Sequence, residues 1–116
     1  MKRNNDLLRQ MLFEFEGDKD YLVLDRMHLG MSQEDREWQH HLELLCDQGF
    51  IIQISKSGYR LTFAGHDFIE AIRSDTIWKK TKAGAKELGG ATLGMMADMA
   101  IAYLKQEAAE KLGLEL

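Results

Sequence analysis

The chain has 116 residues, of which 45% are apolar and 29% charged, with one cysteine, no proline and a net charge of −4. This length and apolar content predict one compact domain that buries roughly two thirds of its unfolded surface, which excludes a two-domain enzyme. The apolar share argues against a disordered tail, and a single cysteine cannot form an internal disulfide, so we expect a cytoplasmic globular protein.

The first predicted element is an amphipathic helix over residues 6–16, where apolar side chains recur at helical spacing. Asn4 or Asn5 can cap its start. A polar run then breaks the pattern, and residues 21–24 are rich in side chains that suit a half-buried strand. We therefore expect a short strand after the first helix.

A second helix is predicted over residues 33–48. Ser32 can act as its N-cap, and Asp35 gives a weakened form of the capping box. Gly49 is the expected left-handed stop. Only about 15 residues separate the first two helices, and they read as extended, so a separate helix between them is reduced or absent.

The segment after Gly49 alternates apolar and polar residues, which predicts a β-hairpin with its turn at Ser57–Gly58. Each strand would place three apolar side chains on one shared face: Phe50, Ile52 and Ile54, then Tyr59, Leu61 and Phe63.

Two more helices are expected, one over residues 65–80 capped near Thr62 and a last one over about residues 92–112. Gly84, Gly89 and Gly90 mark a connection between them, because each glycine costs about 1 kcal/mol in a helix interior. The organisation expected is a core over residues 1–82, a connection over 83–91, and a C-terminal helix over 92–116 that packs on the core or on a second subunit.

The order helix, strand, helix, hairpin, helix predicts an α+β fold with a winged-helix-like core and an additional C-terminal helix. Such a fold does not by itself establish DNA binding.

Several stretches also match the pattern of a known family: residues 1–9 (MKRNNDLLR), 41–45 (HLELL), 49–51 (GFI), 61–73 (LTFAGHDFIEAIR), 77–78 (IW) and 86–90 (KELGG). Together they resemble an uncharacterised domain-of-unknown-function family of short bacterial and prophage proteins. The resemblance covers nearly the whole chain and departs at residues 25–31, which are longer here. It implies a winged-helix-like domain of bacterial or phage origin, with no activity, cofactor or catalytic residue to transfer.

The helix before the hairpin carries the wrong charge for reading DNA. Residues 34–48 hold five acidic residues against one basic residue, whereas a helix in the major groove approaches phosphates that repel carboxylates. A second mode stays open, in which the hairpin and the segment after it contact phosphates. Its candidate residues are Lys56, Arg60, Lys79, Lys80, Lys82 and Lys86. The simpler interpretation of these lysines is a solvated helix end.

The last helix is apolar nearly all round, so one of its faces needs a cover that a small core does not provide. The candidate self-association residues are Leu93, Met96, Met99, Ala100, Tyr103 and Leu104. Complete burial within one subunit is the equal alternative. The acidic helix of one copy could also face the basic segment of another.

No coherent catalytic or metal site is visible. His40 and His41 point about 100° apart on a helix and supply too few ligands for zinc. Cys46 lies on the apolar side of its helix without a neighbouring cation, which predicts a buried, inert thiol. An enzyme would need a pocket that brings His66 to a distant carboxylate such as Glu14 or Asp25.

We therefore expect a non-enzymatic interaction module that binds protein partners or itself, with no metal or other cofactor. A DNA-binding regulator is the alternative. No signal peptide, membrane span or small-molecule substrate is evident, since the longest apolar run, residues 99–104, is far below the ~20 residues that cross a bilayer.

Overall fold

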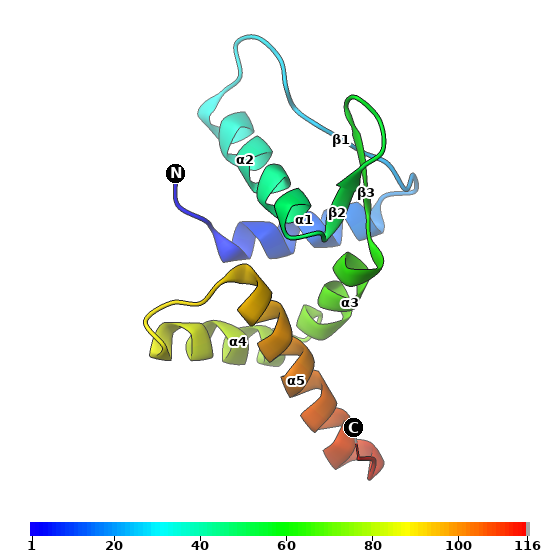
Figure 1. Cartoon of the computed structure of the whole chain (residues 1–116), viewed down its shortest axis with the longest axis vertical. Coiled ribbons are helices and arrows are strands. Elements are labelled where there is room, and N and C mark those ends of the chain that lie inside the picture. Colours follow the sequence, from blue (N-terminus) through cyan, green and yellow to red (C-terminus); the bar gives the residue numbers. More distant parts are fainter. Residues whose placement is uncertain (116) are drawn as a thin grey trace. The chain divides into compact units, whose positions relative to one another are not determined.

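The structure is a computed structural model that describes residues 1–115 (Figure 1). Its helices and strands are α1 (Asn5–Gly17), β1 (Val23–Leu24), α2 (Gln33–Asp47), β2 (Ile51–Gln53), β3 (Gly58–Leu61), α3 (Phe63–Ile72), α4 (Asp75–Glu87) and α5 (Leu93–Leu112). The chain divides into two compact units, residues 1–66 and the residues from 67 onward. The boundary falls inside α3, and each unit is described separately below.

Residues 1–66 form the winged-helix-like part of the α+β fold, as predicted. The strands make one antiparallel sheet in the order β1-β3-β2, so the first strand pairs with the far strand of the hairpin. Val23 is opposite Tyr59, and Tyr59 is opposite Gln53. An extended segment occupies residues 25–31, where a full helix-turn-helix would have another helix (Figure 1).

The predicted hairpin face is wrong by one residue. Ile51 is 1% exposed, whereas Ile52 and Ile54 are 46% and 44% exposed. Phe50 is buried but lies before β2, and its backbone N–H donates to the Leu45 carbonyl at the end of α2. Because side chains alternate along a strand, this tie to the helix turns Ile51 inward and its two aliphatic neighbours outward.

Helix starts follow the predicted caps. The Asn4 side chain accepts from the backbone N–H of Leu7, and the Ser32 side chain accepts from that of Asp35. The Thr62 hydroxyl accepts from the Gly65 N–H in the same way, at the start of α3. Each hydroxyl or amide oxygen satisfies a backbone donor that has no partner within the helix.

The core of residues 1–66 is built from one face of each helix and the inner face of the sheet. Its buried apolar residues are Leu8, Met11, Leu12, Phe15, Val23, Trp38, Leu42, Leu45, Phe50, Ile51 and Tyr59. The Phe15 and Trp38 rings meet edge to face at 6.1 Å, which couples the end of α1 to the middle of α2.

The single helix expected over residues 65–80 is two helices. α3 ends at Ile72, and Ser74 has an extended backbone whose side chain accepts from the Ile77 N–H to start α4. Ser74 is followed by an acidic residue in the first turn, Asp75, so a second N-cap signal stood within the predicted helix.

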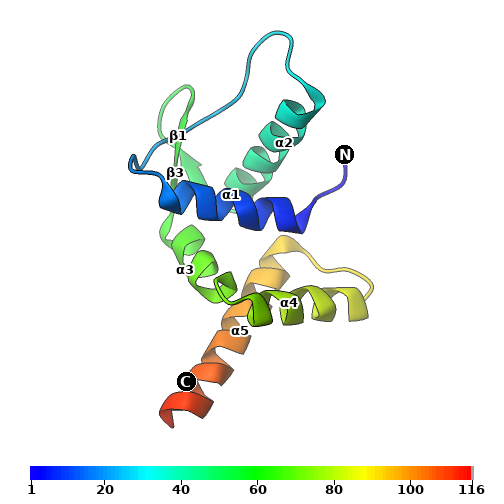
Figure 2. The same ribbon diagram turned by 180° about the vertical axis from the view of Figure 1, so that it is seen from behind.

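The glycine connection is shorter than the expected residues 83–91, because α4 continues to Glu87. Gly84 lies inside α4, and only Gly89 and Gly90 adopt the positive φ values of a turn. α5 then starts at the Thr92 cap, as predicted, and packs against α4 (Figure 2). At their crossing, a Cβ on Gly84 would come within 2.5 Å of the end of the Met99 side chain.

Candidate functional site

The lysines proposed to contact nucleic acid divide between the two units. Lys79, Lys82 and Lys86 are three and four residues apart on α4, so they share one stripe of that helix. Lys80 lies off the stripe, with its ammonium 6.0 Å from the Tyr103 ring of α5. The Lys82 ammonium is 5.5 Å from the Trp78 ring. These two cations therefore have aromatic neighbours as well as solvent.

The hairpin supplies the other two candidate cations. Lys56 is exposed in the turn between β2 and β3, and Arg60 is exposed in β3, where its guanidinium donates to the Leu61 carbonyl. Both belong to residues 1–66, and the register places Arg60 opposite the outward Ile52.

Half of the residues proposed for self-association are buried in the chain itself. Leu93, Met96 and Ala100 are 6%, 0% and 0% exposed, so they present no surface to a second copy in this conformation. Met99, Tyr103 and Leu104 are partly exposed. Burial within one chain therefore accounts for three of the six candidates, and the partly exposed three keep self-association open as a prediction.

The exposed side of α2 is acidic. Glu34, Glu43 and Asp47 are exposed, together with a single base, Arg36. The opposite side is buried through Trp38 and other residues that pack inward. The position that reads DNA in a winged helix therefore presents carboxylates to solvent, which is the sign expected from the sequence.

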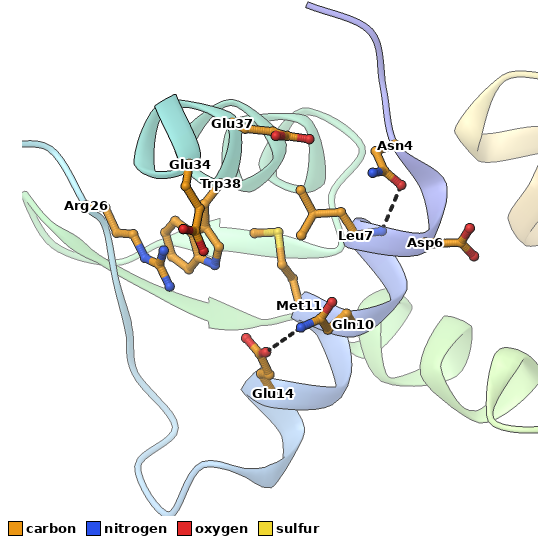
Figure 3. Close-up of a pocket in the computed structure, with 10 residues that line it drawn as sticks. All are labelled: Asn4, Asp6, Leu7, Gln10, Met11, Glu14, Arg26, Glu34, Glu37 and Trp38. Carbon is orange, nitrogen blue, oxygen red and sulfur yellow. Dashed lines mark hydrogen bonds between the residues drawn. The ribbon is translucent and has the colours of Figure 1, made fainter. Parts of the chain in front are cut away.

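A pocket of about 320 Å³ lies between α1 and α2 (Figure 3). Its lining residues are Asn4, Asp6, Leu7, Gln10, Met11, Glu14, Arg26, Glu34, Glu37 and Trp38. We call it the acidic pocket, because four carboxylates and one guanidinium line it. A second pocket of about 420 Å³ shares Glu14, Arg26 and Trp38 and extends to Leu22 and Leu24.

Trp38 and Arg26 form the common wall of these two pockets. The Arg26 guanidinium lies 4.2 Å from the centre of the indole ring, an arrangement of cation on aromatic face. The indole nitrogen is shut off from solvent and has no hydrogen-bond acceptor among the described residues. Figure 3 shows this nitrogen on the side of the ring turned toward α1, where Glu14 and Met11 lie.

Asp35 fixes the extended segment before α2. Its carboxylate is 3.4 Å from both the Arg26 guanidinium and the His28 ring, and the Arg26 backbone N–H donates to the Gln39 side chain. Desolvation raises the pKa of Asp35, but hydrogen bonds from Ser32 and the nearby cations outweigh it, so the pKa is lowered below its usual value.

His41 is a structural residue that ties the N-terminus to α2. It is completely buried, its Nε2 accepts from the Asn4 backbone N–H at 2.8 Å, and its Nδ1 lies 2.7 Å from the Glu37 carbonyl. A neutral ring with its proton on Nδ1 satisfies both contacts. His41 is therefore used within the fold rather than presented to a ligand.

The outward face of the sheet carries exposed aliphatic side chains beside one base, Arg60. Leu24, Ile52 and Ile54 are 67%, 46% and 44% exposed, and the strand register places all three on the side opposite the buried Ile51. Gly58 lies between Leu24 and Ile54 and is buried, with the side chains of Ser55 and Leu22 beside its Cα. We call this surface the outer sheet face, with Leu22 at its edge.

Residues 2–92 match the family described as "Hypothetical protein (DUF2513)". The chain belongs to the DUF2513 family. A relative among the curated proteins, described as an uncharacterised protein of Haemophilus influenzae (strain ATCC 51907 / DSM 11121 / KW20 / Rd), is 33% identical over 98 residues, which cover 74% of this chain and 80% of the relative. No solved structure matches.

The DUF2513 match confirms the resemblance seen in the sequence. Some of the candidate surfaces lie within the matched residues and others lie outside them. The match includes the acidic pocket, the outer sheet face and the lysine stripe of α4, but it does not include Leu93, the first residue of α5. The family match thus ends at residue 92, before the start of α5.

The remaining chemical candidates of this DUF2513 chain do not assemble into a reactive set. His66 is exposed and lines a pocket with Glu16, Asp18 and Asp20, not with Glu14 or Asp25. Cys46 is half-buried rather than buried. Within residues 1–115, no group of three or more His, Cys, Asp or Glu residues could hold a metal ion, and no helix is sufficiently long and apolar to cross a membrane.

Sequence reasoning missed the acidic pocket and the outer sheet face. The contact of Trp38 with Arg26 joins residues 12 apart through an irregular segment. Ile52 and Ile54 were expected on one face with Phe50 and Tyr59, which are buried, but both are exposed. The available signal was Phe50, which directly follows the helix-stopping Gly49 and is bound to the helix end.

Proposed function

We propose that this protein is a non-enzymatic interaction module, of bacterial or prophage origin and cytoplasmic, that binds a partner protein through the outer sheet face. The supporting observation is the cluster of exposed aliphatic side chains at Leu24, Ile52 and Ile54. Apolar side chains scattered singly are normal on a surface, but neighbours on one sheet face are typical of contact sites.

The acidic exposed side of α2 favours binding of a protein over insertion of this helix into the major groove of DNA. Glu34, Glu43 and Asp47 would face phosphates in a winged-helix complex, and each would oppose binding at every DNA sequence. A protein partner, unlike DNA, does not carry negative charge over its whole surface, so the carboxylates of α2 do not oppose its binding. The winged-helix-like fold can then serve as a scaffold for the outer sheet face.

Site-specific photocrosslinking tests this proposal. A photoreactive amino acid at Ile52 is expected to give a discrete adduct in the native cell, and the adduct is expected to disappear when Leu24 and Ile54 are changed to Lys. The same probe at the exposed Lys105 of α5 is the matched control. An adduct with a second copy would identify self-association, which light scattering would confirm. Absence of any Ile52-specific adduct contradicts the proposal.

The alternative function is DNA binding through the hairpin and the basic segment. It is favoured by the lysine stripe of α4, Lys79, Lys82 and Lys86. This alternative predicts a gel shift of duplex DNA at low salt that is weakened by Lys79→Glu, Lys80→Glu and Lys82→Glu together. We expect at most a weak shift that is confined to low salt, and a lysine-sensitive shift that persists at physiological salt would replace the proposed function.

A further inference from the structure

The acidic pocket contains a buried donor without an acceptor. Trp38 is 8% exposed, and its Nε1–H finds no partner among the described residues. An unsatisfied buried donor destabilises a fold, and native proteins rarely keep one without a reason. Because the ring nitrogen is turned toward the α1 side of the pocket (Figure 3), a ligand oxygen entering there would satisfy it.

The charges around this donor favour a cation. Glu34 and Glu37 line the pocket, and no ion pair or hydrogen bond of either carboxylate is found in residues 1–115. Glu14 accepts only a hydrogen bond of 3.2 Å from Gln10. Arg26 is the one basic residue of the lining, and it is already paired with Asp35. A positively charged group would therefore meet three carboxylates in a partly enclosed space.

We propose that the acidic pocket binds the side chain of a lysine or arginine presented by an extended segment of a partner polypeptide. The carboxylates of Glu34 and Glu37 hold the cation, and the Trp38 Nε1–H donates to a backbone carbonyl of the same segment. A volume of about 320 Å³ is at the small end of ligand pockets, which suits one side chain. The Glu14 side chain, which is exposed, moves aside to open the nitrogen.

An extended segment is specified because its carbonyls are free to accept. The lysines of a second copy's α4 do not meet this requirement, since they lie on a helix whose carbonyls are used internally. At the end of α4 the Gly84, Ala85 and Lys86 carbonyls accept from Leu88, Gly90 and Gly89. The basic helix of this chain is therefore a poor occupant, despite its charge.

The second pocket gives the direction of such a segment. It shares Glu14, Arg26 and Trp38 with the acidic pocket and ends at Leu22 and Leu24 of the outer sheet face. A segment seated at Trp38 would run on toward the aliphatic surface. The choice of a polypeptide as the ligand rests on the proposed function. The test below uses small probes, however, and does not require the outer sheet face.

The test follows the Trp38 indole resonance by NMR, assigned against Trp78→Phe, while Nα-acetyl-lysine methylamide is added. This probe carries both the ammonium and the carbonyl, and it is expected to move the Trp38 N–H signal downfield in a saturable way. Nα-acetyl-norleucine methylamide lacks the cation and n-butylammonium lacks the acceptor, so we expect neither to reproduce the shift.

Charge-neutral variants complete the test. Glu34→Gln with Glu37→Gln is expected to weaken probe binding on the order of three- to ten-fold, whereas Glu43→Gln, an exposed acid of α2 outside the pocket, leaves it unchanged. No saturable shift at tens of millimolar probe, equal binding of the norleucine analogue, or a Trp38 signal that moves with protein concentration alone would each overturn the inference. None of these results affects the Ile52 crosslink, so the two proposals fail separately.

Discussion

Gly65 lies where the first turn of α3 passes the backbone of Phe50. A Cβ at this position would overlap the Phe50 carbonyl oxygen, which already accepts from the Thr62 N–H. Gly65→Ala is therefore expected to lower the free energy of unfolding by about 1–3 kcal/mol, since backbone has to move. Urea denaturation followed by circular dichroism measures the change.

Gly84→Ala is the matched control for that substitution. Its Cβ would overlap the flexible end of the Met99 side chain, which can turn away, and would touch the Tyr103 hydroxyl at 3.4 Å, while alanine is the better helix former. We expect a change within about 1 kcal/mol of zero. Equal losses in the two variants would show that the contact at Gly65 is not the cause.

Tyr59 makes the protein sensitive to alkali. Burial raises the pKa of its phenol, and electrostatic interactions with Asp25, Cys46 and Glu43 raise it further. The unfolded chain thus ionises first, so the stability contributed by neutral Tyr59 is fully present below about pH 10 and is lost as pH rises through the higher folded pKa. Tyr59→Phe is expected to flatten the alkaline decline in stability, whereas the exposed Tyr21→Phe is expected to leave it unchanged.

Local residue roles could be predicted from the sequence, and distant partners could not. The Asn4, Ser32 and Thr62 caps are bonds to backbone groups three residues away, so residue type and spacing suffice to find them. The partners of His41 and Trp38 lie on other segments, and their identity depends on how the chain packs. That is why the acidic pocket had no signature in the sequence.

The register of the hairpin is the main element that periodicity misassigned. Alternation alone favoured the face of Phe50, Ile52 and Ile54, because the other face combines Ile51 with the polar Gln53 and Ser55. The tie between Phe50 and Leu45 chooses between them. We predict that Ile51→Ala costs about 2–5 kcal/mol of unfolding free energy, whereas Ile52→Ala costs less than about 1 kcal/mol. Comparable losses, measured by urea denaturation, would contradict the register.

The start of α2 predicts an acid-dependent loss of stability. The pKa of Asp35 is lowered in the folded state by Ser32, His28 and Arg26, so this carboxylate stabilises the fold above its unfolded pKa near 3.9. The contribution is lost as pH falls through the still lower folded pKa. Asp35→Asn is expected to destabilise the protein at pH 7 and to flatten the decline between about pH 4 and pH 2.

Asp47→Asn serves as the comparison for this pH profile, because Asp47 is an exposed carboxylate at the opposite end of α2. We expect its thermal midpoint to follow that of the unaltered protein across the same range. If the Asp35 variant kept the full acid-side slope, the ion pairs with Arg26 and His28 would not be what holds the segment at residues 25–31.

For the whole molecule, the order of helices and strands in the sequence was sufficient to predict the fold class. It was not sufficient to predict which side chains lie on the surface. Residues 1–66 hold 11 acidic and 8 basic residues, which is a small excess of negative charge. The favoured partner depends less on this total than on where the charges lie, since the exposed side of α2 is acidic. The sequence located the acidic helix and the basic run correctly. Whether an apolar residue faces solvent is a property of packing: Ile52 is exposed against expectation, and Met96 is buried, which was one of the two alternatives left open by the sequence.

The dependence of DNA affinity on salt tests the charge distribution of the whole chain. The stripe of Lys79, Lys82 and Lys86 can neutralise about three phosphates, which gives a slope of roughly −2.7 for log affinity against log salt concentration. We predict that any duplex binding is confined to low salt, with a slope no steeper than this, and that changing all three lysines to Gln abolishes it. A steeper slope, retained in the triple variant, would require contacts from the hairpin cations Lys56 and Arg60 and would favour the DNA-binding alternative over a protein-binding module.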